Sequence, residues 1–256
     1  KAVGKKIPSL LNEQREKFIK GAIGKKHDGK FAEEVFEKVI EPFAGYGFNR
    51  AHAVCYGLIA YHTAYLKAHY PLEFMTALLC NDANNTDRVV LEIKECNEMG
   101  IDVLPPSINH SQMNFHISGE NQIRFGLLAI KGIGEGPISE IIKSRDESEH
   151  FKNLEDFAKR VPSKVLNKKT IQSLAYSGAM DEFGDRNQLS ENYEILSQFS
   201  KNIEKSVSAG QTDIFAVMDS DESSHTSLNL KNVPKSTRMQ RLKWEKDFLG
   251  MYVSGH

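Results

Sequence analysis

The sequence predicts a mainly α fold, with helices along most of the chain and one small β-hairpin. The clearest helix runs from about Ala51 to His69, because its apolar residues recur near the 3.6-residue period and Pro71 then stops it. Shorter amphipathic segments follow along the chain. Apolar and polar residues alternate over Phe115–Phe125, around the polar turn Ser118–Asn121, which is the pattern of a hairpin.

The other predicted elements are shorter. Pro105 and Pro106 favour an extended chain over residues 101–106. Amphipathic helices are expected over residues 9–23, 31–40, 88–99, 138–145, 167–177, 186–205 and 239–249.

Charge is unevenly distributed along the 256 residues, although the net charge is only −1. The first thirty residues hold nine lysines and arginines against three acidic residues. Such a basic segment points to a polyanionic partner. The alternative is a solvated helix face.

Cysteine usage indicates the compartment. Cys55, Cys80 and Cys96 have neither metal-ligand nor redox spacing, and an odd count without a disulfide framework favours a reducing environment. The sequence shows no signal peptide and no membrane-spanning stretch. We therefore expect a cytoplasmic protein that does not contact a membrane.

A glycine-flanked aromatic loop leads into the long helix, with the sequence Phe-Ala-Gly-Tyr-Gly-Phe-Asn-Arg over residues 43–50. Glycines allow a ligand to approach the backbone, and Asn49, Arg50 and His52 would lie at a helix N-terminus, where a phosphate can bind. Chemistry alone favours the alternative, a plain turn with the tyrosines in a core.

The residues of this region carry a resemblance. The string from Phe43 to Met75 resembles the fingers domain of the bacterial C-family replicative DNA polymerases, whose pattern is F-A-G-Y-G-F-N-K-S-H, a tyrosine-rich helix and L-K-A-H-Y-P-x-E-F-M. The chain departs from the pattern at Arg50, Ala51 and His62. The resemblance implies that the loop helps to bind an incoming deoxynucleoside triphosphate. It also implies that a basic segment near the start binds the triphosphate, which here maps to Lys1, Lys5 and Lys6.

A second motif follows the predicted hairpin. An apolar run ends in Lys131-Gly132-Ile133-Gly134, followed by Glu135, Gly136 and a helix, which is the helix-hairpin-helix pattern. We expect both glycines of the turn to adopt positive φ, so that N–H groups at the next helix N-terminus bind a DNA backbone phosphate without reading sequence. The resembled family carries a similar segment. Residues 167–180 are predicted to form either a second, degenerate hairpin or a plain helical scaffold.

The last motif lies in a polar stretch. Gln211, Ile214 and Phe215 resemble the pentapeptide by which bacterial polymerases bind the sliding clamp, with glutamine as a polar anchor and two apolar side chains for a pocket. The alternative is that Ile214 and Phe215 pack on their own domain. Asp219-Ser220-Asp221, in the same stretch, is interpreted as solvated surface and not as a metal site.

The motifs and the resemblance together imply four regions: fingers over 1–85, a helix-hairpin-helix DNA-binding domain over 86–205, a linker with the clamp peptide over 206–235, and a helix over 236–256. The end of this last helix, residues 250–256, resembles the family's L-G-x-Y-x-x-G-H segment, which implies an oligonucleotide-binding domain outside the chain. No catalytic or metal-binding residue is expected within the chain. The resemblance implies a palm domain elsewhere that holds Mg²⁺, and DNA, deoxynucleoside triphosphates, the clamp and other replicase subunits as partners.

Three hypotheses follow for function. The first is a segment of a replicative DNA polymerase, predicted to be inactive alone. The second is a non-enzymatic DNA-binding accessory module, since the basic segments and the hairpin support it equally. The third is a nucleotide-binding enzyme that uses the loop before His52 on its own substrate.

Overall fold

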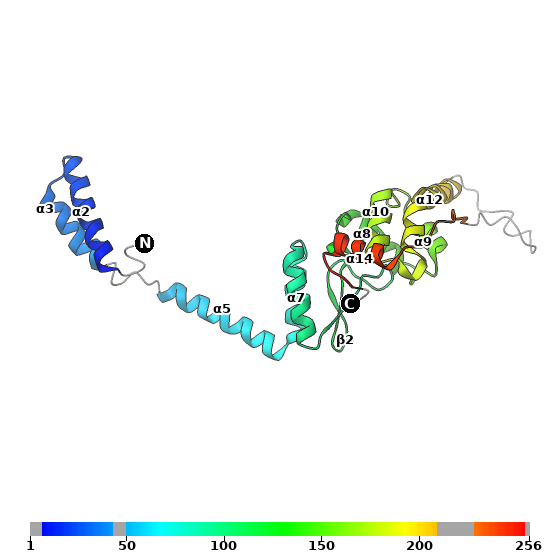
Figure 1. The fold of residues 1–256 in the computed structure, drawn as a ribbon, viewed down its shortest axis with the longest axis horizontal. Helices are drawn as coiled ribbons and strands as arrows, with labels where there is room; N and C mark the ends of the chain where they lie inside the picture. The colour runs from blue at the N-terminus through cyan, green and yellow to red at the C-terminus, as the bar shows by residue number, and fades with distance from the viewer. Residues whose placement is uncertain (1–6, 43–49, 209–227, 254–256) are drawn as a thin grey trace, which may run out of the picture. The chain divides into compact units, whose positions relative to one another are not determined.

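The computed structural model describes residues 7–42, 50–208 and 228–253 (Figure 1). The chain forms two compact units, Lys1–Leu66 and Lys67–His256, and each is described by itself. The predicted mainly α fold with a small hairpin is confirmed. The four predicted region boundaries stay predictions. Among the described residues, no helix has both the length and the apolarity needed to cross a bilayer.

The first unit contains a helical pair and a long helix. Its elements are α2 (Pro8–Gly24), α3 (Gly29–Val35), the π-helix η1 (Phe36–Ile40) that continues α3, and most of α5 (Arg50–His69). Helix α2 packs on α3 and η1 through Phe18 and Phe36, whose ring centroids are 5.8 Å apart. Arg15 adds ion pairs to Glu33 and Glu37 across the same contact.

The second unit begins with two helices and a sheet. Its elements up to the glycine turn are α6 (Pro71–Asp82), α7 (Thr86–Glu98), β1 (Asp102–Leu104), β2 (His116–Gly119), β3 (Gln122–Arg124) and η2 (Leu127–Ala129). Pro71 lies in the first turn of α6, where proline is tolerated because its missing N–H has no helical partner there. The rest of the unit is helical: α8 (Glu135–Asp146), α9 (Leu154–Arg160), α10 (Lys168–Tyr176), η3 (Asp181–Phe183), α11 (Arg186–Glu191), α12 (Tyr193–Ser208) and α14 (Arg238–Leu249).

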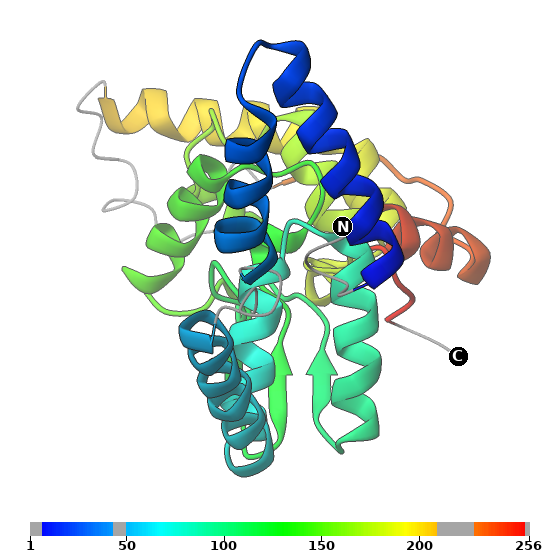
Figure 2. The same cartoon turned by 90° about the vertical axis from the view of Figure 1, so that its left-hand side faces the viewer.

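The sheet has three strands in the order β1-β3-β2. Strands β2 and β3 form the expected antiparallel hairpin, with an irregular register between Ile117 and Gly119. Strand β1, predicted only as an extended segment, pairs parallel to β3. Figure 2 shows strands of this sheet as green arrows, and helices α6 and α7 of the same unit contact the sheet. Helix α6 covers the sheet, and its Met75 and Leu79 are fully buried.

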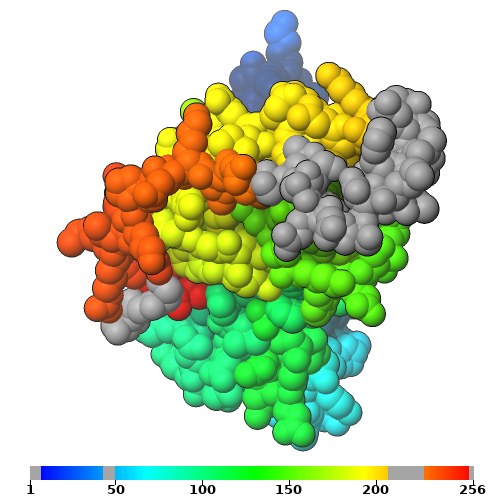
Figure 3. Space-filling view, turned by 90° about the vertical axis from the view of Figure 1, so that its right-hand side faces the viewer, coloured from blue at the N-terminus to red at the C-terminus, as the bar shows by residue number. Residues whose placement is uncertain are grey.

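One predicted helix is wrong in its extent. Residues 186–205 were expected to form a single helix, but α11 ends at Glu191 and α12 begins at Tyr193. The side chain of Asn192, between them, accepts a hydrogen bond from the Lys231 N–H at 2.7 Å and donates one to the Lys231 carbonyl at 3.1 Å. Figure 3 shows the segment that follows Leu228, in orange, against these yellow helices. The break between α11 and α12 therefore coincides with hydrogen bonds to the backbone of Lys231, which is distant in the sequence.

Helix α14 is held against the rest of the second unit by several different contacts. A capping box of Thr237 and Gln240 begins it, and Gly250 ends it in the left-handed conformation, with φ of 81°. The indole of Trp244 stacks on Tyr176 of α10, with ring centroids 4.3 Å apart. The carbonyl of Phe248 accepts a hydrogen bond from the Lys131 N–H at 3.0 Å. Helix α14 thus contacts both α10 and the glycine turn before α8.

Candidate nucleic-acid interface

Apolar side chains anchor the turn formed by residues 131–136. Leu127 and Ile130 before it are fully or almost fully buried. Ile133 and Ile138, both buried, occupy the positions of a hydrophobic staple around the N-terminus of α8. The element before the turn, η2, is a short 3-10 helix. Because these anchors lie below it, the turn itself remains at the surface.

Gly132 has the backbone conformation that its residue type suggested. Its φ is +94°, in the region that side chains disfavour. A Cβ at this position would also lie 2.6 Å from the Oγ of Ser173 on α10, closer than real Cβ atoms approach. The same prediction for Gly134 is wrong, because its φ is −95° and it serves as the N-cap of α8. An N-cap takes extended backbone angles, so positive φ is not required there.

The N-terminus of α8 is open to a ligand. Among the described residues no side chain caps it, and the first turn begins with Glu135, Gly136 and Pro137. The N–H groups of Glu135 and Gly136 belong to the set that has no partner inside a helix, whereas proline has none to offer. In the part of the chain that the structure describes, no neighbouring atom lies within 4 Å of a Cβ built on Gly134 or Gly136. The positive end of α8 therefore carries two N–H donors without a partner inside the helix, beside two glycines whose Cβ positions are unobstructed.

Two lysines accompany this helix end. Lys131 precedes Gly132 and is exposed. Lys169, in the first turn of α10, is also exposed, and its Cε lies 3.8 Å from the position of a Cβ on Gly132. Within the described ranges, neither lysine has an acidic partner. Lys168, which precedes Lys169 in the chain, instead lies over the ring of Tyr193, 5.7 Å from the ring centroid.

A second glycine turn lies at the other end of α10. Gly178 there has φ of +85°, similar to that of Gly132. Its open side is filled: a Cβ would meet Arg186 Nη2 at 2.6 Å and Asp181 Oδ2 at 3.2 Å. Arg186 is 4% exposed and donates to Asp181 at 2.7 and 2.8 Å and to Glu245 of α14 at 3.0 Å. The second turn therefore binds the protein's own ion-pair network.

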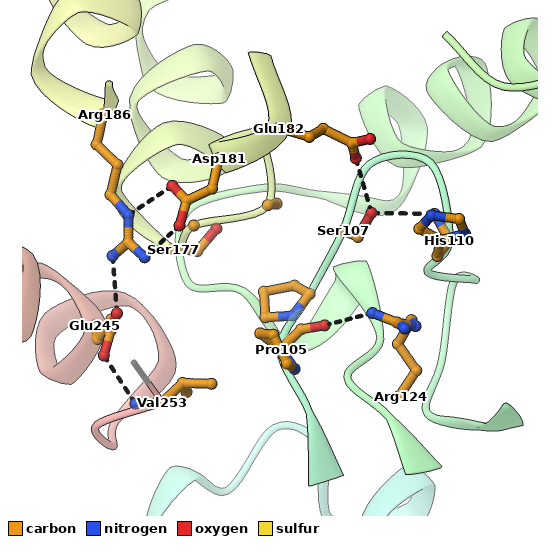
Figure 4. Close-up of a pocket in the computed structure, with 13 residues that line it drawn as sticks. Pro105, Ser107, His110, Arg124, Ser177, Asp181, Glu182, Arg186, Glu245 and Val253 are labelled. Carbon is orange, nitrogen blue, oxygen red and sulfur yellow. Dashed lines mark hydrogen bonds and ion pairs between the residues drawn. The ribbon is translucent and has the colours of Figure 1, made fainter. Parts of the chain in front are cut away.

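A cavity of about 330 Å³ lies beside this second turn (Figure 4). Arg186, Asp181 and Glu245 form one wall, while Glu182, hydrogen-bonded to Ser107, lies opposite. Its lining carries both charge signs, and most of these groups already have partners. Its residues are Pro105, Pro106, Ser107, His110, Arg124, Ser177, Gly178, Ala179, Asp181, Glu182, Arg186, Glu245 and Val253.

The structure brings the predicted DNA-binding residues together in one exposed turn. They are Lys131, Gly132, Ile133, Gly134 and Gly136. Ile133 is 8% exposed and acts as an anchor below the turn.

The nucleotide-binding residues belong to the first unit. Arg50 is the first residue of α5 and is exposed. His52 is exposed and its ring contacts Tyr56, with centroids 4.4 Å apart. Lys1, Lys5, Lys6 and Asn49 lie outside the described residues. Their common role stays a prediction.

The clamp-peptide residues also lie outside the described part of the chain. They are Gln211, Ile214 and Phe215. In the part that is described, no three or more His, Cys, Asp or Glu side chains are grouped so as to hold a metal ion.

Comparisons with known proteins agree with the resemblance. A family model described as a helix-hairpin-helix motif matches residues 100–189, which include α8, α10 and most of α11. Over its whole length the chain is 40% identical to the DNA polymerase III subunit alpha of Pasteurella multocida. It matches a segment of that subunit. The corresponding identities are 38% for the subunit of Thermus aquaticus and 36% for that of Escherichia coli K12, again over the entire chain. The chain spans 20–22% of the length of these three relatives. The predicted resemblance to a part of a C-family polymerase is therefore confirmed.

Sequence reasoning missed two residues that lie at the glycine turn, Ser173 and Lys169. The only signal for Lys169 was its membership of a basic stretch, six lysines and arginines over residues 152–169. Nothing in the sequence connects Ser173 with Gly132, because the two are brought together only when α10 packs behind the turn.

Proposed function

We propose that the chain is part of a bacterial replicative DNA-directed DNA polymerase, and that the turn of residues 131–136 binds the backbone of duplex DNA. The whole-length identity to polymerase subunits supports the first statement. The matched helix-hairpin-helix motif supports DNA binding, since such a turn offers N–H groups to phosphate oxygens and reads no base.

The open N-terminus of α8 is the observation that carries the DNA-binding proposal. Gly136 lies in its first turn with free space around the Cα, so a side chain can be introduced there without a collision. An aspartate at this position favours the helix through its dipole but repels a phosphate. Gly136→Asn adds a side chain of nearly the same size without the charge.

The test is fluorescence anisotropy of the 256-residue chain with a labelled duplex of about twenty base pairs, which is about two helical turns of DNA. Gly136→Asp should weaken binding by about ten-fold, because like charges about 5 Å apart in a partly hydrated site cost on the order of 1–2 kcal/mol. Gly136→Asn should stay within about two-fold of wild type. Equal affinities for the two variants would show that no phosphate lies at this helix end. Binding should also weaken steeply as salt is raised.

The first unit is proposed to help bind an incoming deoxynucleoside triphosphate in the intact enzyme. Cations at Lys1, Lys5, Lys6 and Arg50 would neutralise the triphosphate, as phosphoryl transfer requires. Mg²⁺ would be held by a palm domain outside the chain. Primer extension with the chain alone, with Mg²⁺ and all four nucleotides, should give no product. Product formation would reveal a metal site within the chain.

A sliding clamp is the proposed partner of Gln211, Ile214 and Phe215. The same role implies that the protein also binds other replicase subunits and that it works at the nucleoid, in the cytoplasm. Alanine at all three positions should abolish recovery of the chain on immobilised clamp. Alanine at Asp219 and Asp221, in the same stretch, is the matched control and should leave recovery intact. Retention of the triple variant would remove the clamp from the proposal.

A further inference from the structure

The two glycine turns at the ends of α10 differ in what lies against the glycine. At Gly178 the space is taken by the guanidinium of Arg186, whose charge is satisfied by Asp181 and Glu245. At Gly132 the space is bordered by the hydroxyl of Ser173, with the side chain of Lys169 beside it. Both glycines thus face a polar side-chain atom at 2.6 Å from a Cβ position, but only Arg186 is held by ion pairs in the described part of the chain.

Ser173 has an unusual position for a polar residue. It is 2% exposed, and its Oγ lies 2.6 Å from where the Cβ of Gly132 would be. Several buried serines of the same unit have a partner for the hydroxyl: Ser111 donates to the Phe125 carbonyl at 2.7 Å and Ser200 to the Val161 carbonyl at 3.0 Å. The Ser173 hydroxyl makes no hydrogen bond within the described residues. The Ser173 oxygen is not among the fully buried polar atoms that lack a partner in the described residues, so it keeps contact with solvent and is available to donate a hydrogen bond to a ligand at the turn.

Lys169 and Lys168 are neighbours that differ in surroundings. Lys169 lies at Gly132 without an acidic partner in the described part of the chain. Lys168 lies over the ring of Tyr193 on α12. Both are exposed and both are in the first turn of α10, so they make the same contribution to the charge of this region. They differ in what lies beside them, the glycine turn for Lys169 and the Tyr193 ring for Lys168.

Resting on the DNA-binding role proposed above, we propose that Lys169 and Ser173 of α10 complete the site at the turn, so that one backbone phosphate is held from both sides. On one side are the N–H groups of Glu135 and Gly136 and the side chain of Lys131. On the other side, Lys169 supplies a second cation and Ser173 a hydroxyl donor. The bound group is a phosphodiester of duplex DNA.

The test uses the same anisotropy assay with the 256-residue chain. Lys169→Gln should weaken duplex binding by about five- to ten-fold and reduce the slope of log affinity against log salt by up to about one, as expected when one phosphate contact loses its cation. Lys168→Gln, the matched control, should change affinity by less than about two-fold. Ser173→Ala should weaken binding by about three- to five-fold, the range for loss of one hydrogen bond.

Thermal unfolding without DNA separates binding from folding. Ser173→Ala should leave Tm unchanged or raise it, because the hydroxyl has no partner to lose. A Tm that falls by several degrees would show that the hydroxyl is bonded inside the protein, and would overturn its assignment to the site.

The results also separate this inference from the proposed function. If Gly136→Asp weakens binding while Lys169→Gln and Ser173→Ala do not, the turn binds DNA and the contribution of α10 is refuted. If Lys169→Gln acts and Gly136→Asp does not, the phosphate lies on α10 alone and the two-sided site is refuted. If Lys169→Gln and Lys168→Gln lower the affinity for duplex DNA equally, Lys169 contributes only to the overall surface charge, and its place in the site is refuted. Competition by inorganic phosphate at constant ionic strength should be weak; complete displacement at millimolar concentrations would assign the site to free phosphate.

Discussion

Glu245 is the residue whose replacement tests the packing of α14 most directly. Its side chain is fully buried, and it accepts hydrogen bonds from Arg186 Nη1 at 3.0 Å and from the Val253 N–H at 2.8 Å. Glu245→Gln keeps the shape of the side chain and removes its charge. Arg186 would keep its two bonds to Asp181, which is 47% exposed at the side chain.

The size of the effect can be bounded from these contacts. Removing one partner of a buried ion pair typically costs about 3–5 kcal/mol when the other charge is left alone. Because Asp181 still neutralises Arg186, the expected loss is closer to that of one hydrogen bond to a charged group. We therefore expect the free energy of unfolding to fall by about 2–3 kcal/mol. For a unit of this size, that corresponds to a fall in Tm of roughly 4–12 °C.

Urea denaturation at pH 7, followed by circular dichroism, measures this change. Glu98→Gln is the matched control, because Glu98 pairs with Lys94 at 3.8 Å and both side chains are more than 60% exposed. An exposed pair of this kind contributes less than about 1 kcal/mol. A loss below about 0.5 kcal/mol for Glu245→Gln would refute the reasoning, since Asp181 alone would then satisfy Arg186 and the buried carboxylate would contribute nothing to holding α14.

Three further predictions concern other buried contacts. Burial, followed by the neighbouring Asp82 carboxylate, raises the pKa of Glu92 from 4.5 to about 7, so the folded state loses stability as pH rises from about 4.5 to 7. Glu92→Gln should therefore raise Tm by more at pH 8 than at pH 5. An equal rise in Tm at both pH values would contradict this prediction. Burial alone would raise the pKa of Asp185, but hydrogen bonds from Ser236, Asn187 and Arg241 outweigh burial and lower this pKa to about 2. Asp185→Asn should therefore lower the free energy of unfolding by about 2 kcal/mol at pH 7, and by progressively less as pH falls below 3.8. Urea denaturation at several pH values measures this change. Gly250→Ala should strongly lower the free energy of unfolding, because the φ of Gly250 is +81° and a Cβ there would overlap Thr86 Cγ2. Adding Thr86→Ser should recover part of this loss. If the free-energy changes of the two substitutions simply add in the double variant, the two residues are not in contact.

The sequence could predict elements whose causes are local. The end of α5 at His69 follows from Pro71, and the hairpin of β2 and β3 follows from alternation around a polar turn. The positive φ of Gly132 follows from the motif in which it occurs. In each case the deciding residues are neighbours in the chain, so a pattern of a dozen residues contains the information.

Features that depend on distant partners could not be predicted in this way. The parallel pairing of β1 with β3 joins residues about twenty positions apart, and nothing in Asp102–Leu104 specifies the partner. The interruption at Asn192 coincides with hydrogen bonds to Lys231. Helix propensity alone does not forbid asparagine inside a helix. A window of sequence therefore predicts one helix where packing gives two.

The candidate site shows the same division. Its backbone part, the turn around Gly132 and Gly134, was predicted from the motif, and its α10 part was not. The choice between a second hairpin and a plain scaffold for residues 167–180 also could not be made from sequence. Gly178 does adopt positive φ, but the guanidinium that fills its turn comes from Arg186, and the partner of that guanidinium comes from Glu245. Similar turn sequences thus have different surroundings.

The hydrogen bond between the Lys131 N–H and the Phe248 carbonyl has a consequence for how the protein reaches its native state. It joins segments more than a hundred residues apart, and closing such a loop costs roughly 4 kcal/mol of chain entropy. Contacts of this kind slow folding, since the entropy is lost before the contacts form. During synthesis, the turn at residue 131 leaves the ribosome long before α14, so its hydrogen bond to the Phe248 carbonyl cannot form until α14 has been made. The glycine turn should therefore be among the last parts of the second unit to gain protection from hydrogen exchange during refolding.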